Sequence, residues 1–243
     1  MDDPLYILAE KGMLKDNQKL DIQTLAWIKK ESSPSINDIK KIKEKFSPLK
    51  IDIFKKYLPE EKWFLRKKSL TGIHGLGHIY RVMMYSYLIC EILNVEDFRI
   101  PLISAAIHDV RRKSDKGDLY HGIRAADWCG NQIMKKYDIS EEDLFKIKRS
   151  IRVHNHPDNE ISSEDMNDET TLILKHADAL DRFRLPKIKW WPKKEYVKLK
   201  LDPKIFNLTN YIVWKTEELI LSRKYSPKEA IIYVGLETNI LTK

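Results

Sequence analysis

The order of apolar and polar residues along the chain predicts helices almost throughout. Apolar residues between positions 78 and 93 recur at the spacing of one broad helical face: Val82, Met83, Tyr85, Ile89, Cys90 and Leu93. The same spacing predicts further helices over residues 101–109, 121–134, 140–154, 168–185, 204–222 and 227–241. Neither a sustained alternation nor an Asn-Gly turn marks a hairpin. We therefore predict an all-α fold, a helical bundle with at most a small pair of strands.

Several helix ends are marked by residues that start or stop helices. Ser140 precedes three acidic residues, which is typical of an N-cap because carboxylates favour the positive end of the helix dipole. Ser35 or Asn37 could cap a helix near residue 36. Pro157 and Pro186 end the helices before them, because proline lacks the backbone N–H that a helix interior needs.

Length and composition fit one large domain, or one domain with terminal additions. The 243 residues are 42% apolar and 33% charged, a balance typical of globular proteins. We expect a core over residues 70–186 that carries the chemistry. Residues 1–69 are expected to form an N-terminal helical extension, and residues 187–243 a C-terminal helical segment that packs on the core.

The sequence predicts a cytoplasmic protein with no membrane partner. No run approaches the roughly 18 apolar residues that span a bilayer, and the apolar stretch near the N-terminus is too short for a signal peptide. Cys90 and Cys129 lie far apart and fit no zinc or redox spacing, so we expect two buried free thiols in a reducing compartment.

The formal net charge of +8 favours anionic partners such as nucleotides, phosphate esters or nucleic acids. The lysines are spread over the whole chain, however, which fits an ordinary solvated surface equally well. Trp190 and Trp191 stand among lysines and could stack on the bases of a single strand. The alternative, which we prefer, is that these tryptophans pack against the core.

The histidines are crowded into one part of the chain. All seven lie between positions 74 and 176: His74, His78, His108, His121, His154, His156 and His176. Gly75 and Gly77 make a regular helix unfavourable before His78, so we expect His74 on a loop and His78 in the first helical turn. His108 and Asp109 end an apolar run. Imidazole and carboxylate ligands together suit manganese, iron, cobalt, nickel, zinc or magnesium, so we predict one or two divalent ions per chain.

Asp178 lies among apolar residues, where an unpaired carboxylate is costly. A metal ion would remove that cost, but so would an ion pair with Lys175 or Arg182. His156 competes with His154 as a metal ligand, and His176 competes with Asp178, and the spacing does not decide between them. We prefer His154 because it ends an apolar helical run.

These residues resemble the H…HD…D signature of the HD-domain metal-dependent phosphohydrolase superfamily. The resemblance covers about residues 70–185 and rests on His78-Ile-Tyr-Arg-Val, on His108-Asp109, and on Asp178 in His-Ala-Asp-Ala-Leu-Asp-Arg. His121 and His154 resemble the extra histidines of the two-metal members. The chain departs from many members after the His-Asp pair, where Val110-Arg111-Arg112 replaces a small apolar residue and glycine.

The resemblance implies an HD-domain-like helical bundle and a role for each matching residue. His78, His108, Asp109 and Asp178 would bind a first metal ion, and His121 and His154 would bind a second that Asp109 bridges to the first. His74 resembles the proton donor of cyclic-nucleotide phosphodiesterases, which lies four residues before the first ligand.

The expected reaction is hydrolysis of a phosphate ester, with His74 and Asp109 as catalytic residues. We expect nearby basic side chains to stabilise the charge on the phosphoryl group, namely Arg112, Lys113, Arg124 and Lys175. A phosphorylated small molecule, first of all a nucleotide, is the expected substrate. The alternatives are an HD-type nuclease that acts on single-stranded nucleic acid, and a catalytically silent module that binds a nucleotide.

Overall fold

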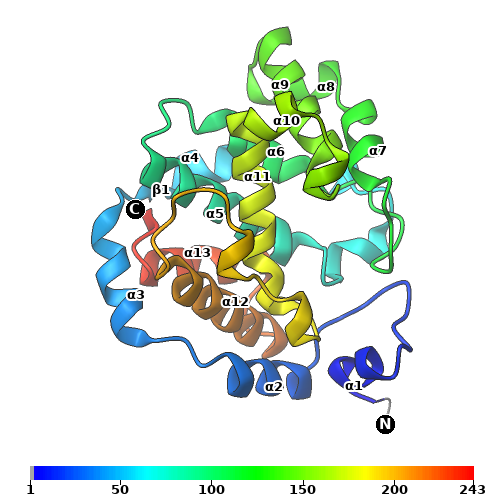
Figure 1. Cartoon of the computed structure of the whole chain (residues 1–243), viewed down its shortest axis with the longest axis vertical. Helices are drawn as coiled ribbons and strands as arrows, with labels where there is room; N and C mark the ends of the chain where they lie inside the picture. The colour runs from blue at the N-terminus through cyan, green and yellow to red at the C-terminus, as the bar shows by residue number, and fades with distance from the viewer. Residues whose placement is uncertain (1–2) are drawn as a thin grey trace.

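Helix α5 (Leu76–Leu93) runs through the interior of the molecule (Figure 1). Its side chains are buried on every face from His78 to Cys90. A helix of this kind is stabilised mainly by packing, at about 1.5–3 kcal/mol for each large apolar side chain that it buries. The helix ends at Asn94, which adopts the left-handed conformation with φ 55°. The other helices are arranged around α5.

Four further helices pack with α5 to form the part of the bundle that carries the histidines. They are α6 (Arg99–Ile107), α7 (His121–Trp128), α9 (Glu141–Val153) and α11 (Glu169–Leu180). Helices α6 and α11 pack against α5, α9 packs against both α6 and α11, and α7 packs on α9. This arrangement brings the starts of α5 and α7 and the ends of α6, α9 and α11 to one place.

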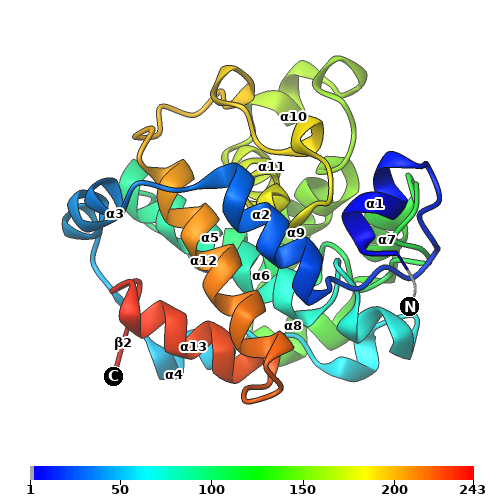
Figure 2. The ribbon, with the colours of Figure 1, turned by 90° about the horizontal axis from the view of Figure 1, so that it is seen from below.

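The C-terminal helices cover another side of α5. Helix α12 (Ile205–Leu221) and helix α13 (Pro227–Glu237) pack against α5 and against each other. Helices α2 (Ile22–Ser32) and α3 (Ile36–Ile42) pack on α12, and Figure 2 shows α2 lying along α12. Segments from the two ends of the sequence are therefore neighbours in space.

The computed structural model describes residues 3–243, and in this range it has thirteen α-helices and two short strands. The remaining helices are α1 (Leu5–Glu10), α4 (Ile51–Lys56), α8 (Asn131–Tyr137) and α10 (Ser163–Asn167). Strands β1 (Leu49–Lys50) and β2 (Leu241–Thr242) form a parallel pair. The predicted all-α fold with one small strand pair is confirmed. No helix within residues 3–243 combines the length and the apolar character that crossing a membrane requires.

The predicted helix starts agree with the structure where capping residues mark them. The Ser140 hydroxyl accepts a hydrogen bond from the Asp143 N–H at 3.0 Å, and the Asp143 carboxylate accepts one from the Ser140 N–H at 3.3 Å. This reciprocal pair starts α9. Ser35, rather than Asn37, caps α3. His74 lies in a turn before α5, and His78 is in the first turn of α5, as predicted.

Two predicted helix ranges are wrong. The helix expected over residues 121–134 is broken into α7 and α8, because Cys129 and Gly130 adopt extended conformations between them. The helix expected to reach residue 241 ends at Glu237, and Asn239 then takes a left-handed conformation with φ 59°. The chain after this turn forms β2, which only its pairing with β1 could reveal.

Candidate metal centre

Three buried side chains from α5 and from the end of α6 form the first candidate metal-binding group. His78 Nε2 lies 3.1 Å from His108 Nε2 and 3.5 Å from Asp109 Oδ2. The three ligand atoms lie within 4.8 Å of one another, so one ion could contact all of them. Asp178, from α11, brings its Oδ1 atom to 3.4 Å from His78 Nε2 and extends the group.

A second buried group adjoins the first and uses the same carboxylate. His121, the first residue of α7, places Nε2 at 3.0 Å from Asp109 Oδ1. His154, which follows the last residue of α9, places Nε2 at 3.1 Å from His121 Nε2. These two histidines and Asp109 also have their ligand atoms within 4.8 Å of one another. Asp109 therefore directs one oxygen to each group.

All four histidines of these groups are held with Nε2 toward the common centre, because Nδ1 contacts an oxygen behind each ring. His108 Nδ1 lies 2.7 Å from the Ala105 carbonyl oxygen, and His154 Nδ1 lies 2.7 Å from that of Ile151. His121 Nδ1 contacts the carbonyl oxygen of Asp118. An oxygen acceptor at Nδ1 favours the tautomer whose Nε2 lone pair is free to bind a metal ion.

His78 has a carboxylate behind its ring instead of a carbonyl. Its Nδ1 lies 2.7 Å from Asp181 Oδ2, and Asp181 is fully buried. Arg81, also fully buried, donates from Nε to Asp181 Oδ1 at 2.6 Å, and Arg184 Nη1 lies 3.2 Å from Asp181 Oδ2. Arg81 also pairs with Glu217 at 2.6 Å. The ligand His78 is thus anchored by a buried network of charged residues.

Asp181, Arg81 and Arg184 were not singled out from the sequence. The sequence does mark one of the three, because Arg81 interrupts an otherwise apolar helical stretch. A buried arginine needs a carboxylate partner, since an unpaired buried charge is very costly. The sequence does not show which of the many acidic residues supplies it.

The electrostatics of the centre favour the forms that bind metal. Burial lowers the pKa of His108 to about 4 and holds that of His154 well below its usual value, so both rings are neutral at pH 7. Burial alone would raise the pKa of Asp109, but Arg112 and the adjacent histidines outweigh it and hold this pKa well below its usual range. Neutral imidazoles and an ionised carboxylate are the states that ligate a divalent ion.

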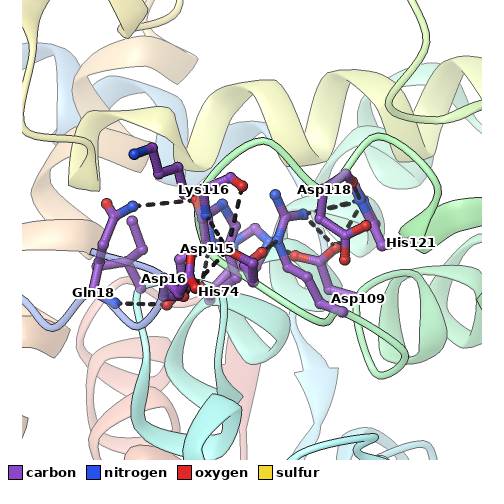
Figure 3. Close-up of polar contacts among 12 residues, drawn as sticks. Asp16, Gln18, His74, Asp109, Asp115, Lys116, Asp118 and His121 are labelled. Atoms are coloured by element: carbon purple, nitrogen blue, oxygen red, sulfur yellow. Dashed lines mark hydrogen bonds and ion pairs between the residues drawn. The ribbon is translucent and has the colours of Figure 1, made fainter. Parts of the chain in front are cut away.

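His74 lies beside the first group and is held by a carboxylate that sequence reasoning missed. Its Nδ1 lies 2.9 Å from Asp115 Oδ1, and its ring meets the His78 ring edge-on at a centroid distance of 5.7 Å. Figure 3 shows His74 and Asp115 next to each other, with Asp109 and His121 further along. Burial, followed by the charge of Arg112, holds the pKa of His74 well below its usual value.

Only one of the four basic residues expected at the phosphoryl group reaches the centre. Arg112 Nη1 lies 3.0 Å from Asp109 Oδ1 and 3.1 Å from His121 Nε2. Arg124 instead pairs with Asp118. Lys175 donates to the carbonyl oxygen of His156 at 2.6 Å, and neither Lys175 nor Lys113 lines the cavity at the centre.

His156 and His176, the two alternative ligands that the sequence spacing left open, lie outside both groups. His176 Nδ1 lies 2.6 Å from the Leu172 carbonyl oxygen, and its Nε2 accepts a hydrogen bond from the backbone N–H of Lys198 at 2.9 Å. His156 belongs to neither group of ligand atoms among residues 3–243. The structure thus brings His154 and Asp178 to the centre and leaves His156 and His176 out.

A cavity of about 280 Å³, which we call the central cavity, opens onto the two groups. Its lining includes ligand residues of both groups, His74 and three arginines. The lining residues are His74, Asp109, Arg112, Gly117, Asp118, Leu119, His121, Asn155, Asp178, Arg182, Arg184, Leu185 and Trp190. The three arginines in this lining are matched by three aspartates, two of which belong to the candidate metal centre. With metal ions bound to those carboxylates, the arginines would leave the cavity suited to an anion such as a phosphoryl group.

The two adjacent tryptophans have different environments. Trp191 packs against Trp27 and Phe183 at centroid distances of 5.7 and 5.8 Å, and its Nε1 donates to the Leu185 carbonyl oxygen at 2.8 Å. Trp190 is only partly buried and lines the central cavity. Core packing therefore accounts for Trp191, whereas Trp190 belongs to the wall of the site.

The fold and the site define an all-α protein with two adjoining buried His/Asp groups that could hold metal ions. Comparison with protein-family models, with curated proteins and with solved structures finds no match to this chain.

Proposed function

We propose that this chain is a metal-dependent phosphohydrolase of the HD type that acts on a nucleotide or a related phosphate ester. The observation that carries the proposal is the position of Asp109. Its Oδ2 atom lies 3.5 Å from His78 Nε2, and its Oδ1 atom lies 3.0 Å from His121 Nε2. A single carboxylate that serves two adjacent groups of ligands is the arrangement that a two-metal centre requires.

The residues present fit divalent ions well. The oriented Nε2 atoms, the shared carboxylate and Asp178 supply the ligands, and a mixed set of imidazoles and carboxylates suits manganese, iron, cobalt, nickel, zinc or magnesium. Two bound ions would supply an activated water and would neutralise charge on the phosphoryl oxygens. The remaining chemistry belongs to the protein's own side chains.

Two arginines of the central cavity would hold the phosphoryl group. Arg112 and Arg182 both line the cavity, and Arg112 is within hydrogen-bond distance of the shared carboxylate. Planar guanidinium groups bind phosphate oxygens in a fixed geometry and stay charged at neutral pH. They would therefore orient the ester beside the ligand groups and stabilise the charge that develops during transfer.

His74 would move the proton that the reaction requires. Asp115 holds His74 Nδ1 and so directs Nε2 away from that carboxylate. The lowered pKa of His74 means that its neutral form prevails at pH 7, so a bound phosphate must supply the negative charge that favours its protonated form. As proton donor to the leaving oxygen, His74 would then give an activity that falls as the pH rises.

Metal analysis combined with a substrate panel tests the proposal. We expect purified protein to carry divalent metal, and after reconstitution to hydrolyse at least one nucleotide or simple phosphate ester. Asp109→Ala should abolish this activity and reduce the metal content, because it removes a ligand from both groups. Asp127→Ala, at an exposed carboxylate that pairs with Arg152, is the matched control and should change neither quantity.

The panel should include mononucleotides, cyclic dinucleotides and single-stranded oligonucleotides. Cleavage of oligonucleotides alone would favour the nuclease alternative. Tight nucleotide binding without turnover, with each of the metals named above, would favour the silent binding module. Absence of bound metal together with full activity of Asp109→Ala would refute the proposed function.

A further inference from the structure

A second cavity of about 400 Å³, which we call the side chamber, adjoins the central cavity. The two cavities share His74, Arg112, Gly117, Leu185 and Trp190 in their walls. Four of its other lining residues come from the N-terminal region, namely Ala9, Gly12, Leu14 and Gln18, and four come from later in the chain, namely Ile73, Asp115, Lys116 and Lys187. A molecule bound at the candidate metal centre can therefore extend into the side chamber past His74 and Arg112.

Hydrogen bonds join the N-terminal wall of the side chamber to residues beside the candidate metal centre. The Ile73 N–H donates to the Gln18 carbonyl oxygen at 2.9 Å, and the Asp115 N–H donates to that of Asp16 at 2.8 Å. The Gln18 N–H donates to Asp115 Oδ2 at 2.8 Å. Figure 3 shows Asp16 and Gln18 beside Asp115 and His74. Asp115 thus holds both the wall and His74, so the chamber and the proposed proton-transfer residue form one unit.

The lining of the side chamber differs in chemistry from that of the central cavity. Its apolar part comes from Ala9, Leu14, Ile73, Leu185 and the ring of Trp190. The Nζ atom of Lys187 lies 5.4 Å from the centroid of the Trp190 ring, so the lysine makes a cation–π contact with that ring. An apolar wall with an aromatic ring and lysines suits a flat ring that is joined to an anionic group.

We propose that the side chamber binds the base of a nucleoside monophosphate whose phosphate lies in the central cavity. This assignment rests on the proposed function and narrows its substrate class. Stacking against Trp190 would hold the base, since every nucleobase has a flat face that can stack on an aromatic side chain. The volume of about 400 Å³ is at the low end of small-molecule sites, which suits one base with its sugar rather than a polynucleotide strand.

Equilibrium binding to the 243-residue chain tests the assignment without relying on turnover. The probes are adenosine 5′-monophosphate, uridine 5′-monophosphate, ribose 5-phosphate, inorganic phosphate and a single-stranded decanucleotide, measured by titration calorimetry. We expect at least one of the two nucleotides to bind about fivefold or more tightly than ribose 5-phosphate, because stacking of one base is worth at least that factor.

A matched pair of substitutions locates the binding. Leu14→Trp places a large side chain at the wall of the side chamber, and Met13→Trp places the same side chain at an exposed neighbouring position outside it. Leu14→Trp should weaken nucleotide binding about fivefold or more and leave the binding of ribose 5-phosphate unchanged. Met13→Trp should bind every probe as the unmodified protein does. Circular dichroism spectra confirm that both variants are folded.

The outcomes separate this assignment from the proposed function. Binding that depends on the base and is lost in Leu14→Trp supports the assignment, even if no phosphate ester is hydrolysed. Equal binding of nucleotides and ribose 5-phosphate overturns it, even if both are hydrolysed. Tighter binding of the decanucleotide than of the mononucleotides, no binding of any probe, or an unchanged affinity in folded Leu14→Trp also overturns it.

Discussion

Replacement of Asp181 by asparagine tests whether the buried charged network supports the candidate metal centre. Asp181 is fully buried and contacts His78 Nδ1 at 2.7 Å, Arg81 Nε at 2.6 Å and Arg184 Nη1 at 3.2 Å. Burial alone would raise the pKa of Asp181, but the two arginines outweigh it and keep this pKa below its usual value. The substitution preserves the shape of the side chain and removes its charge.

Two separate losses are expected in Asp181→Asn. Arg81 then retains Glu217 as its one charged partner among residues 3–243. Removing one partner of a buried ion pair costs about 3–5 kcal/mol of unfolding free energy. This is a large part of the roughly 5–15 kcal/mol that stabilises a typical domain. The weaker hold on the His78 ring should also lower metal affinity by about 10–100-fold, as loss of a carboxylate behind a ligating histidine does in other sites.

The two losses need two assays. Urea unfolding followed by circular dichroism in the presence of EDTA measures stability without a contribution from metal. Competition with a chelating dye then measures the affinity for Mn²⁺. Glu218→Gln is the matched control, because it removes one partner of an exposed ion pair with Lys29 and should cost under about 1 kcal/mol without changing metal affinity. A variant Asp181→Asn with stability and metal affinity both like the unmodified protein would refute the role of the network.

Three further predictions follow from particular contacts. Burial lowers the pKa of His108 to about 4 from an ordinary value near 6.5, so its contribution to stability is complete above pH 6.5 and is lost as the pH falls toward 4. Between pH 7 and pH 5, EDTA-treated unmodified protein should therefore lose on the order of 2 kcal/mol more unfolding free energy than His108→Gln does, because the lowered pKa values of His74 and His154 affect both proteins alike. A Cβ atom at Gly75 would collide with backbone carbonyl oxygens, whereas one at Gly77 would meet side-chain atoms at 3.4 Å or more, an ordinary van der Waals distance. Gly75→Ala should lower the unfolding free energy by about 1–3 kcal/mol, and an equal effect of Gly77→Ala would contradict this explanation. Arg112 occupies hydrogen-bonding positions on two ligands of the second group, so Arg112→Ala should tighten binding of the second Mn²⁺ ion by about tenfold or more in calorimetry. Arg124→Ala is the control, because it also removes one positive charge but should not tighten binding of the second ion. Weaker binding of the second ion in Arg112→Ala would show that Arg112 does not compete with that ion for Asp109 and His121.

The helical part of the fold could be predicted from local patterns. The spacing of apolar residues marked α5, α6, α9, α11 and α12, because a helix that packs on a core needs apolar residues on one face. Capping also acts between residues that are neighbours in sequence, which is why Ser140 marked the start of α9. The break after Trp128 was missed, because Gly130 alone did not reveal that two residues would adopt extended conformations.

The sequence also indicated which kinds of residues would form the site. Clustered histidines, the His108-Asp109 pair and a carboxylate in an apolar segment already predicted a metal centre, because these residue types are costly to bury without a partner. Placing His78 within the first turn of a helix required only the two glycines before it. These inferences depend on composition and on neighbours a few residues apart.

Only the tertiary structure decided which side chains meet. His154 reaches the centre and His156 does not, although they are two residues apart, because the packing of α9 against α6, α7 and α11 determines which side chain faces inward. Asp181 meets a histidine and an arginine about a hundred positions earlier in the chain. The N-terminal region joins the site through hydrogen bonds between residues 16 and 18 on one side and residues 73 and 115 on the other. Local sequence patterns specify helices and their apolar faces, but contacts between distant residues arise only when all the helices pack together.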